Sequence, residues 1–295
     1  STAFVLRRCG SLGIIHRFQT IEGQLNVFVM ANSVPETSSC HNDLPDLRNY
    51  SRTAVGCAIG VSDDYRERYF ALYNAGCRLF CVDTANGFNS KINGAIALLM
   101  DSPDKVQIIA GNIATREGYE YLANLGVDAV RVGMSGGSVC TTRQETGVYM
   151  PTLESVDECE KWRKSHSRFK YPLIIADGGI RTPADMAKAL AVGADAVMGG
   201  RVFAGYKESP GTIVSDRINN KLYKLYRGAA SHGVQKESNG EIPDYNEGAE
   251  ELVPFIDKSV ATVVKRFKNG FRSTMSMMNA KTISEFRENV SIEKL

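Results

Sequence analysis

The sequence lacks the features that mark several large classes of protein. It has no apolar run close to the roughly 20 residues that a membrane-spanning helix needs, so we expect no membrane partner. The formal net charge is only +2 and the Lys and Arg residues are scattered, which gives no electrostatic footprint for nucleic acid. The seven cysteines contain no C-x-x-C pair and the four histidines form no cluster. We therefore expect no disulfide framework, no structural metal site and a reducing, cytoplasmic location.

What the sequence does contain is a repeating pattern of short apolar runs and longer amphipathic segments. Seven runs are candidate strands: residues 13–16, 53–59, 79–83, 107–111, 129–133, 173–177 and 196–200. The clearest candidate helices between them are residues 64–74, 116–125 and 183–192, and the last has a proline in its first turn after Thr182. This alternation predicts an α/β fold around a parallel sheet.

The most informative segment is the glycine-rich stretch 133–143, which reads Gly-Met-Ser-Gly-Gly-Ser-Val-Cys-Thr-Thr-Arg. It follows a short buried strand candidate and therefore places Cys140 in a loop at a strand end. A cysteine attacks as the thiolate, and glycines allow backbone N–H groups to approach it and stabilise that charge. The alternative is that Cys140 is a small buried hydrophobic residue, as most free cysteines are.

Two further glycine turns follow the last two candidate strands. They read Asp177-Gly178-Gly179 and Gly199-Gly200-Arg201. Each turn alone is more simply a tight turn, but two of them on neighbouring strands favour a phosphate site built from backbone amides.

The stretch Gly-Ser-Val-Cys-Thr-Thr-Arg, residues 137–143, resembles the active-site loop of the IMP dehydrogenase and GMP reductase family. The similarity runs from about Gly10 to about Phe286 and includes several motifs in the same order. It implies a single catalytic TIM (β/α)8 barrel over residues 1–295. Because only seven of eight strands are found, the first barrel strand is expected upstream of this sequence. The resemblance also implies a linker, or the place of an omitted CBS-type insertion, at 31–50 and a mobile flap at 228–254.

The same resemblance implies roles for individual residues. Asp177 would accept hydrogen bonds from the ribose hydroxyls of the substrate, and Arg201, which replaces a small residue of the family, would either contact phosphate or point into solvent. The remaining residues expected around the substrate are Ser138, Gly178, Gly179, Gly199, Gly200, Tyr226 and Gly228. Those expected around the nicotinamide cofactor are Asp83, Ala85, Asn112 and Gly133, and a monovalent cation is expected near Gly133, Gly137 and Cys140.

Both reactions of the family pass through a covalent thioimidate adduct between the cysteine, here Cys140, and C2 of the purine. A dehydrogenase then activates water with an arginine of an Arg-Tyr pair on the flap, whereas a reductase expels ammonia and accepts hydride from NADPH. Residues 228–254 contain no arginine, and Asp244-Tyr245 stands near the expected pair. The stretch 83–87 also has the reductase form D-x-A-N-G.

Other stretches favour the dehydrogenase. Residues 176–181 and 208–211 are more similar to dehydrogenase sequences, and the arginine that reductases place before the flap Glu-Gly is missing before Glu247-Gly248. Because the flap carries the step that differs, we predict an NADPH-dependent GMP reductase that forms IMP and ammonia. The alternatives are an IMP dehydrogenase and an inactive relative that binds purine nucleotides.

In this prediction Cys140 attacks C2, and Thr142 with Glu247 handles the proton that the departing amine takes up. The alternative for Glu247 is one more solvated acid beside Glu250 and Glu251. The resemblance implies a homotetramer. The final Glu-Lys-Leu differs in one residue from the S-K-L signal, so a peroxisome-like organelle is a second candidate location.

Overall fold

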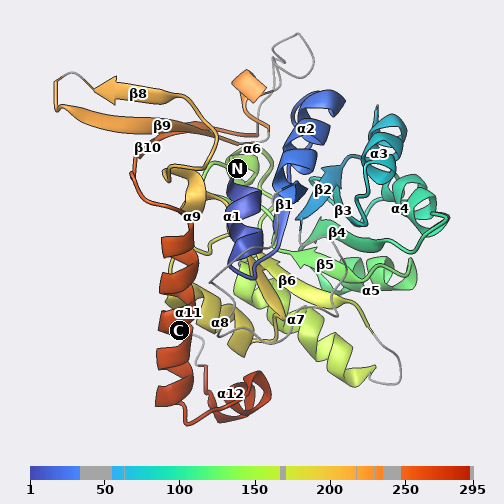
Figure 1. The fold of residues 1–295 in the computed structure, drawn as a ribbon. Coiled ribbons are helices and arrows are strands. Elements are labelled where there is room, and N and C mark those ends of the chain that lie inside the picture. The colour runs from blue at the N-terminus through green and yellow to red at the C-terminus, as the bar shows by residue number, and fades with distance from the viewer. Residues whose placement is uncertain are drawn as a thin grey trace.

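The computed structural model describes residues 1–33, 55–62, 64–166, 171–216, 218–228, 230–234 and 247–292. Seven parallel strands form one curled sheet in the order of the chain, and Figure 1 shows helices around its outer face. These strands are β1 (Gly13–Ile15), β2 (Val55–Ile59), β3 (Leu79–Asp83), β4 (Gln107–Ile113), β5 (Ala129–Val132), β6 (Leu173–Asp177) and β7 (Ala196–Met198).

The helices that precede, connect and follow these strands alternate with them, as expected for βα units. They are α1 (Thr2–Arg8), α2 (Ile21–Asn32), α3 (Tyr65–Asn74), α4 (Ile92–Met100), α5 (Arg116–Asn124), α6 (Thr142–Thr146), α7 (Thr152–Ser165), α8 (Pro183–Ala191) and α9 (Arg201–Ala204). Local sequence explains where several begin. At α8 the Thr182 side chain accepts a hydrogen bond from the Asp185 amide while the Asp185 carboxylate accepts one from the Thr182 amide. This reciprocal cap fixes the start of α8 next to Pro183.

The sheet is buried on both faces, which explains the almost uninterrupted apolar runs. The larger cluster packs between the strands and the helices and includes the fully buried rings of Phe80 and Tyr119. A smaller cluster fills the inside of the curved sheet; its buried members are Ala58, Leu79, Cys81, Ile109, Ala129 and Ile175. The interior is therefore a packed core, and only the strand ends are left for chemistry.

A second, three-stranded antiparallel sheet projects from the side of the barrel (Figure 1). It consists of β8 (Ile213–Asp216), β9 (Lys221–Arg227) and β10 (Glu250–Pro254), with β9 in the middle. Lys224 anchors this sheet, because its buried ammonium group donates to the carbonyl oxygens of Tyr206 and Ser209 at 2.7 and 2.6 Å. The chain ends with α11 (Ala261–Met277), which packs on α8, and α12 (Ile283–Asn289).

The TIM-barrel prediction is confirmed, and the strands occupy seven of the eight barrel positions. Within the described ranges no strand pairs with both β7 and β1, so the sheet is open between them. That the first strand lies upstream stays a prediction. Of the expected linker at 31–50, residues 31 and 32 belong to α2, and 34–50 lie outside the described residues. Among the described helices, none combines the length and the apolar character that crossing a membrane would require.

Candidate active site

The carboxyl ends of the parallel strands lie at one edge of the barrel and carry most of the predicted site residues. β3 ends at Asp83 and β6 ends at Asp177, while Asn112 lies near the end of β4. Gly133 follows β5 directly, and Gly199-Gly200 follows β7. The structure therefore brings the residues expected for substrate and for cofactor together at the edge where barrel enzymes bind their ligands.

Arg131, on β5, connects the two carboxylates of this edge. Its Nη2 donates to Asp177 Oδ2 at 2.7 Å, and its Nη1 donates to Asp83 Oδ1 at 2.6 Å. The side chains are only 14% exposed for Arg131, 24% for Asp83 and 19% for Asp177. One guanidinium thus holds both the carboxylate expected at the substrate ribose and the one expected at the cofactor.

The hydrogen bonds to Asp177 are concentrated on one oxygen. Oδ2 accepts from Arg131 and, at 2.9 Å, from the Asn112 amide group, which also donates to the Gly133 carbonyl at 2.8 Å. The other oxygen has no hydrogen bond to a described residue, so it is left to accept from hydroxyl groups of a ligand. This geometry fits the role in ribose binding that the sequence predicted for Asp177.

The sequence reading did not identify Arg131 as a site residue. Burial disfavours the charge of this guanidinium, but Asp177 and Asp83 outweigh burial and raise the pKa of Arg131 well above its usual value. The signal was present in the sequence, because a permanently charged side chain interrupts the apolar run 129–132 one position from its end. A buried charge of this kind requires partners of opposite sign nearby.

Gly133 is a position where only glycine fits. Its φ is +134°, and a Cβ there would lie 1.9 Å from the carbonyl oxygen of Asp177. The end of β5 can therefore pack directly against the end of β6. This close approach turns the chain into the loop that carries Cys140.

Cys140 begins a hydrogen-bonded relay with the two residues predicted to act with it. Its thiol donates to Thr142 Oγ1, with Sγ 3.2 Å from the oxygen, and the Thr142 hydroxyl donates to Glu247 Oε2 at 2.5 Å. All three side chains are partly exposed. A thiol, a hydroxyl and a carboxylate in this order can pass a proton from sulfur to Glu247 and leave the negative charge on the nucleophile.

Backbone contacts hold Glu247 against the cysteine loop. The Thr141 amide donates to the Glu247 carbonyl at 2.9 Å, and Cys140 and Gly248 form an antiparallel bridge. The segment around Gly248 thus runs beside the loop as a short strand and continues into β10. Gly228 closes the other side, because a Cβ there would lie 2.9 Å from the Val139 carbonyl oxygen.

The residues expected to bind phosphate also gather at this edge. Ser138, Gly179 and Gly200 are exposed, and a Cβ on Gly200 would lie 3.1 Å from the Tyr226 hydroxyl. Tyr226 lies near Ser138, and burial, helped by the negative charge of Asp177, raises the pKa of Tyr226. A neutral phenol and a serine hydroxyl are suitable donors for an anionic ligand.

Two expected substrate residues have partners that the sequence did not reveal. Arg201, whose side chain is 37% exposed, is paired with an acid: its Nε donates to Glu251 Oε2 at 3.0 Å, and its Nη2 donates to the second oxygen of that carboxylate. Gly178 packs against the backbone of Gly136, where a Cβ would be only 3.1 Å away. The expected Asp244-Tyr245 position lies outside the described residues.

The residues expected at the cofactor site form a continuous surface. Ala85 is exposed beside the partly exposed Asp83, and the backbone of the loop 84–87 is tied to Gly111 and Asn112 by hydrogen bonds. A carboxylate beside an exposed backbone loop suits a ligand with ribose hydroxyls and an amide, so the donor set fits a nicotinamide cofactor.

For a cation, the Gly133 and Gly137 carbonyls each accept one hydrogen bond, from Asn112 and from the Cys140 amide. Each carbonyl oxygen keeps one lone pair for an ion. Among the described residues, no group of three or more His, Cys, Asp or Glu side chains is arranged to hold a metal.

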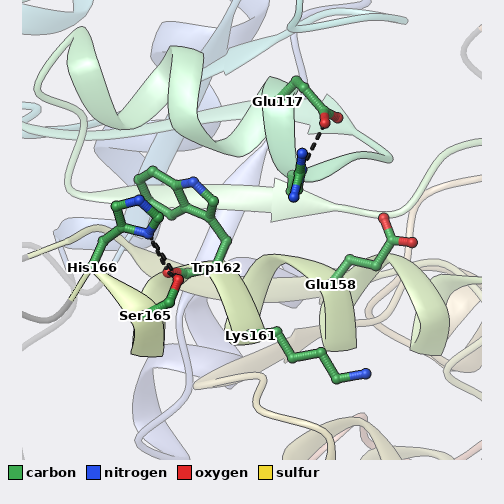
Figure 2. A pocket seen from close by; sticks show the side chains of 7 residues that line it. Glu117, Glu158, Lys161, Trp162, Ser165 and His166 are labelled. Atoms are coloured by element: carbon green, nitrogen blue, oxygen red, sulfur yellow. Dashed lines mark hydrogen bonds and ion pairs between the residues drawn. The ribbon is translucent and has the colours of Figure 1, made fainter.

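A separate groove of about 470 Å³ lies on the outer helix layer, between α5 and α7 (Figure 2). Trp162 and His166 stack at 4.3 Å on one side of it, and exposed charged side chains surround them. Its lining residues are Arg116, Glu117, Glu158, Lys161, Trp162, Ser165 and His166, none of which belongs to the strand-end cluster. The groove therefore does not contribute to the candidate active site.

Comparison with known proteins agrees with this geometry. The sequence model described as "IMP dehydrogenase / GMP reductase domain" matches residues 1–295. The chain is 40% identical over 255 residues to an inosine-5'-monophosphate dehydrogenase of Nitrosopumilus maritimus, with 83% of this chain and 52% of the relative covered. The corresponding enzyme of Aquifex aeolicus is 34% identical over 295 residues, covering 96% of this chain and 57% of the relative.

The chain therefore spans about half the length of these relatives. The match over its whole length, together with a cysteine loop at the strand ends of a barrel, shows that the chain belongs to the IMP dehydrogenase / GMP reductase family.

Proposed function

We propose that this chain is a nicotinamide-dependent oxidoreductase that acts at C2 of a purine nucleoside 5'-monophosphate through Cys140. The observation that carries this proposal is the relay from Cys140 through Thr142 to Glu247, with separations of 3.2 and 2.5 Å. A protein that only bound nucleotides would need no nucleophile connected to a proton acceptor. The inactive relative is therefore the weakest of the three candidates.

In this proposal each half of the site has its own task. Asp177 binds the ribose of the substrate through its unoccupied oxygen, and Ser138, Gly200 and Tyr226 bind the phosphate. Asp83 and the neighbouring loop hold the cofactor, which supplies hydride transfer when bound. Cys140 adds to C2 as its proton passes toward Glu247, and the departure of hydride or ammonia from C2 then leaves the purine attached to sulfur as a thioimidate.

The two reactions of the family differ in the group that leaves C2 of the purine and in the group that replaces it. In IMP oxidation, hydride leaves C2 for NAD, and water then releases XMP from the sulfur. In GMP reduction, ammonia leaves C2, hydride from NADPH replaces it, and the sulfur then departs to give IMP.

The relatives favour IMP oxidation, because those described above are named inosine-5'-monophosphate dehydrogenases. We therefore propose IMP dehydrogenase as the first candidate. The prediction from the sequence placed GMP reductase first. GMP reductase remains the second candidate because residues 228–254 contain no arginine to activate water.

Steady-state assays with the purified chain separate the candidates. Reduction of NAD that depends on IMP identifies a dehydrogenase, whereas oxidation of NADPH that depends on GMP, with release of ammonia, identifies a reductase. Nucleotide binding without either reaction would reject the catalytic proposal. Mass spectrometry of the quenched reaction should show a purine attached to Cys140 in both catalytic cases.

A further inference from the structure

Arg201 and Glu251 form an ion pair that joins the barrel to the small sheet. Arg201 follows Gly200 after β7, and Glu251 is in β10. The guanidinium uses two of its nitrogens, Nε and Nη2, for the two carboxylate oxygens. This parallel two-point contact fixes the relative position of the two segments more closely than a single hydrogen bond would.

The pair lies next to the proposed phosphate site. Glu251 is directly opposite Tyr226 in the β9–β10 ladder, and the Tyr226 hydroxyl lies beside Gly200. The Nη1 group of Arg201 makes no hydrogen bond to a described residue. Since a guanidinium carries five N–H donors in a planar fork, Arg201 can hold Glu251 with one edge and an anion with the other.

The pair is also connected to the proton relay through the backbone. Glu247 and Glu251 are four residues apart on one extended segment, which pairs first with the cysteine loop at Gly248 and then with β9. The Ala249 amide donates to the Val139 carbonyl at 2.8 Å, so the segment has little freedom between the two acids. A displacement of Glu251 would therefore move Glu247 relative to Thr142.

We propose that Arg201 and Glu251 are positioning residues that connect the substrate phosphate to the proton relay. The phosphate binds the free edge of Arg201, and Arg201 in turn holds Glu251 and its strand so that Glu247 stays within reach of Thr142. This inference rests on the proposed function, because it requires a phosphate-bearing substrate at this edge. It implies that the 5'-phosphate accelerates the chemical step in addition to strengthening binding.

The test compares a nucleoside monophosphate with its nucleoside in Glu251→Gln and Arg201→Gln variants. The two substrates are IMP and inosine, assayed with NAD, or GMP and guanosine, assayed with NADPH. The choice follows the monophosphate that the unchanged chain turns over. Glu251→Gln should lower kcat for the monophosphate about tenfold and change its KM by less than about twofold. Arg201→Gln should lower kcat similarly and also raise KM about tenfold, because a contact with a charged group is lost.

Three further results distinguish positioning from a merely structural role. Both variants should slow the nucleoside less than the monophosphate, the double variant should have the kcat of Arg201→Gln alone, and Glu251→Asp should recover part of the rate. Asp104→Asn is the control: it breaks the Arg78–Asp104 pair, in which Arg78 Nη2 donates to Asp104 at 2.7 Å, and it should change neither rate.

Equal losses with nucleoside and monophosphate, additive losses in the double variant, or an unchanged kcat would each overturn the inference. Failure of the unchanged chain to turn over either monophosphate would instead overturn the proposed function.

Discussion

The two halves of the candidate site are built differently. The binding half, with Asp83, Asn112, Arg131 and Asp177, stands on strand ends and is held by side-chain hydrogen bonds between neighbouring strands. The reactive half, with Cys140, Thr142 and Glu247, stands on a loop and on a segment 105 residues farther along the chain. The relative position of these three side chains depends on backbone pairing between Cys140 and Gly248.

This difference suggests that the binding half is rigid and that the reactive half is mobile. The binding residues stand on strands of the barrel core, so we expect them to keep the same geometry whether or not a ligand is present. The reactive residues depend on a contact between two surface segments, which can open and close as ligands enter and leave. Substitutions in the two halves should therefore change different parameters.

The largest effect is expected in the reactive half, at the nucleophile. Cys140→Ala should lower kcat by at least about 10⁴-fold, the scale seen when an enzyme loses the residue that forms its covalent intermediate. Calorimetry should show that the nucleotide still binds, because the ribose and phosphate contacts come from other strands. The Cys159→Ala variant is a control for losing a buried thiol away from the site, because the Cys159 thiol donates to the Thr115 carbonyl in the helix layer. Near-normal turnover of Cys140→Ala would exclude the covalent route.

The next effect is expected at the end of the relay. Glu247→Gln should slow single-turnover chemistry by about 10² to 10⁴-fold, the usual contribution of general acid–base catalysis, with little change in nucleotide affinity. Glu250 is an exposed acid on the following strand, so Glu250→Gln is the matched control. It should change neither the single-turnover rate nor the nucleotide affinity. A Glu247→Gln variant with weaker nucleotide binding and an unchanged saturated rate would show that Glu247 is a binding residue only.

A smaller effect on rate is expected in the binding half. Arg131→Met leaves Asp83 and Asp177 without their shared partner and should weaken nucleotide and cofactor binding together, each by about tenfold. It should also lower the free energy of unfolding by about 2 to 3 kcal/mol, below the range for fully buried pairs because these carboxylates are partly exposed. Arg131→Lys keeps the positive charge but loses the planar guanidinium. Its ligand affinities and its free energy of unfolding should lie between those of Arg131→Met and those of the unchanged chain. Loss of affinity for only one ligand in calorimetry would contradict a shared role.

The smallest effect on catalysis is expected at the opposite end of the barrel. There Asp195 accepts hydrogen bonds from Arg163 at 2.5 Å and from the Ile174 amide at 2.9 Å. Burial alone would raise the pKa of Asp195, but these bonds and the charges of Arg163 and Arg287 outweigh it and lower that pKa. The carboxylate therefore stabilises the fold above its unfolded pKa near 4, and this stability is lost as the pH falls through the lower folded value.

Asp195→Asn should thus lower the melting temperature at neutral pH and flatten its fall in acid, while kcat and both KM values stay unchanged. Thermal unfolding at several pH values measures the first effect, and the assays above measure the second. A changed kcat would show that the two ends of the barrel are not independent.

Much of the binding half was predictable from the sequence, since parallel strands must end at a common edge. The runs at 79–83 and 173–177 predicted the strands that end at Asp83 and Asp177. Arg131 was missed because its apolar neighbours determine the strand, and only the folded sheet shows which charges it faces. Glu251 was missed for a similar reason, because its partner Arg201 is 50 residues away.

By itself, the sequence determined the barrel and the residue types at its active edge. Apolar runs, caps and glycines act over a few neighbouring positions, so they can be read locally. Only the tertiary structure decided that Glu247 reaches Thr142, that one arginine joins Asp83 to Asp177, and that Arg201 is paired with Glu251. Each of these contacts connects segments far apart in the chain, and its geometry depends on how the strands and the flanking sheet pack together.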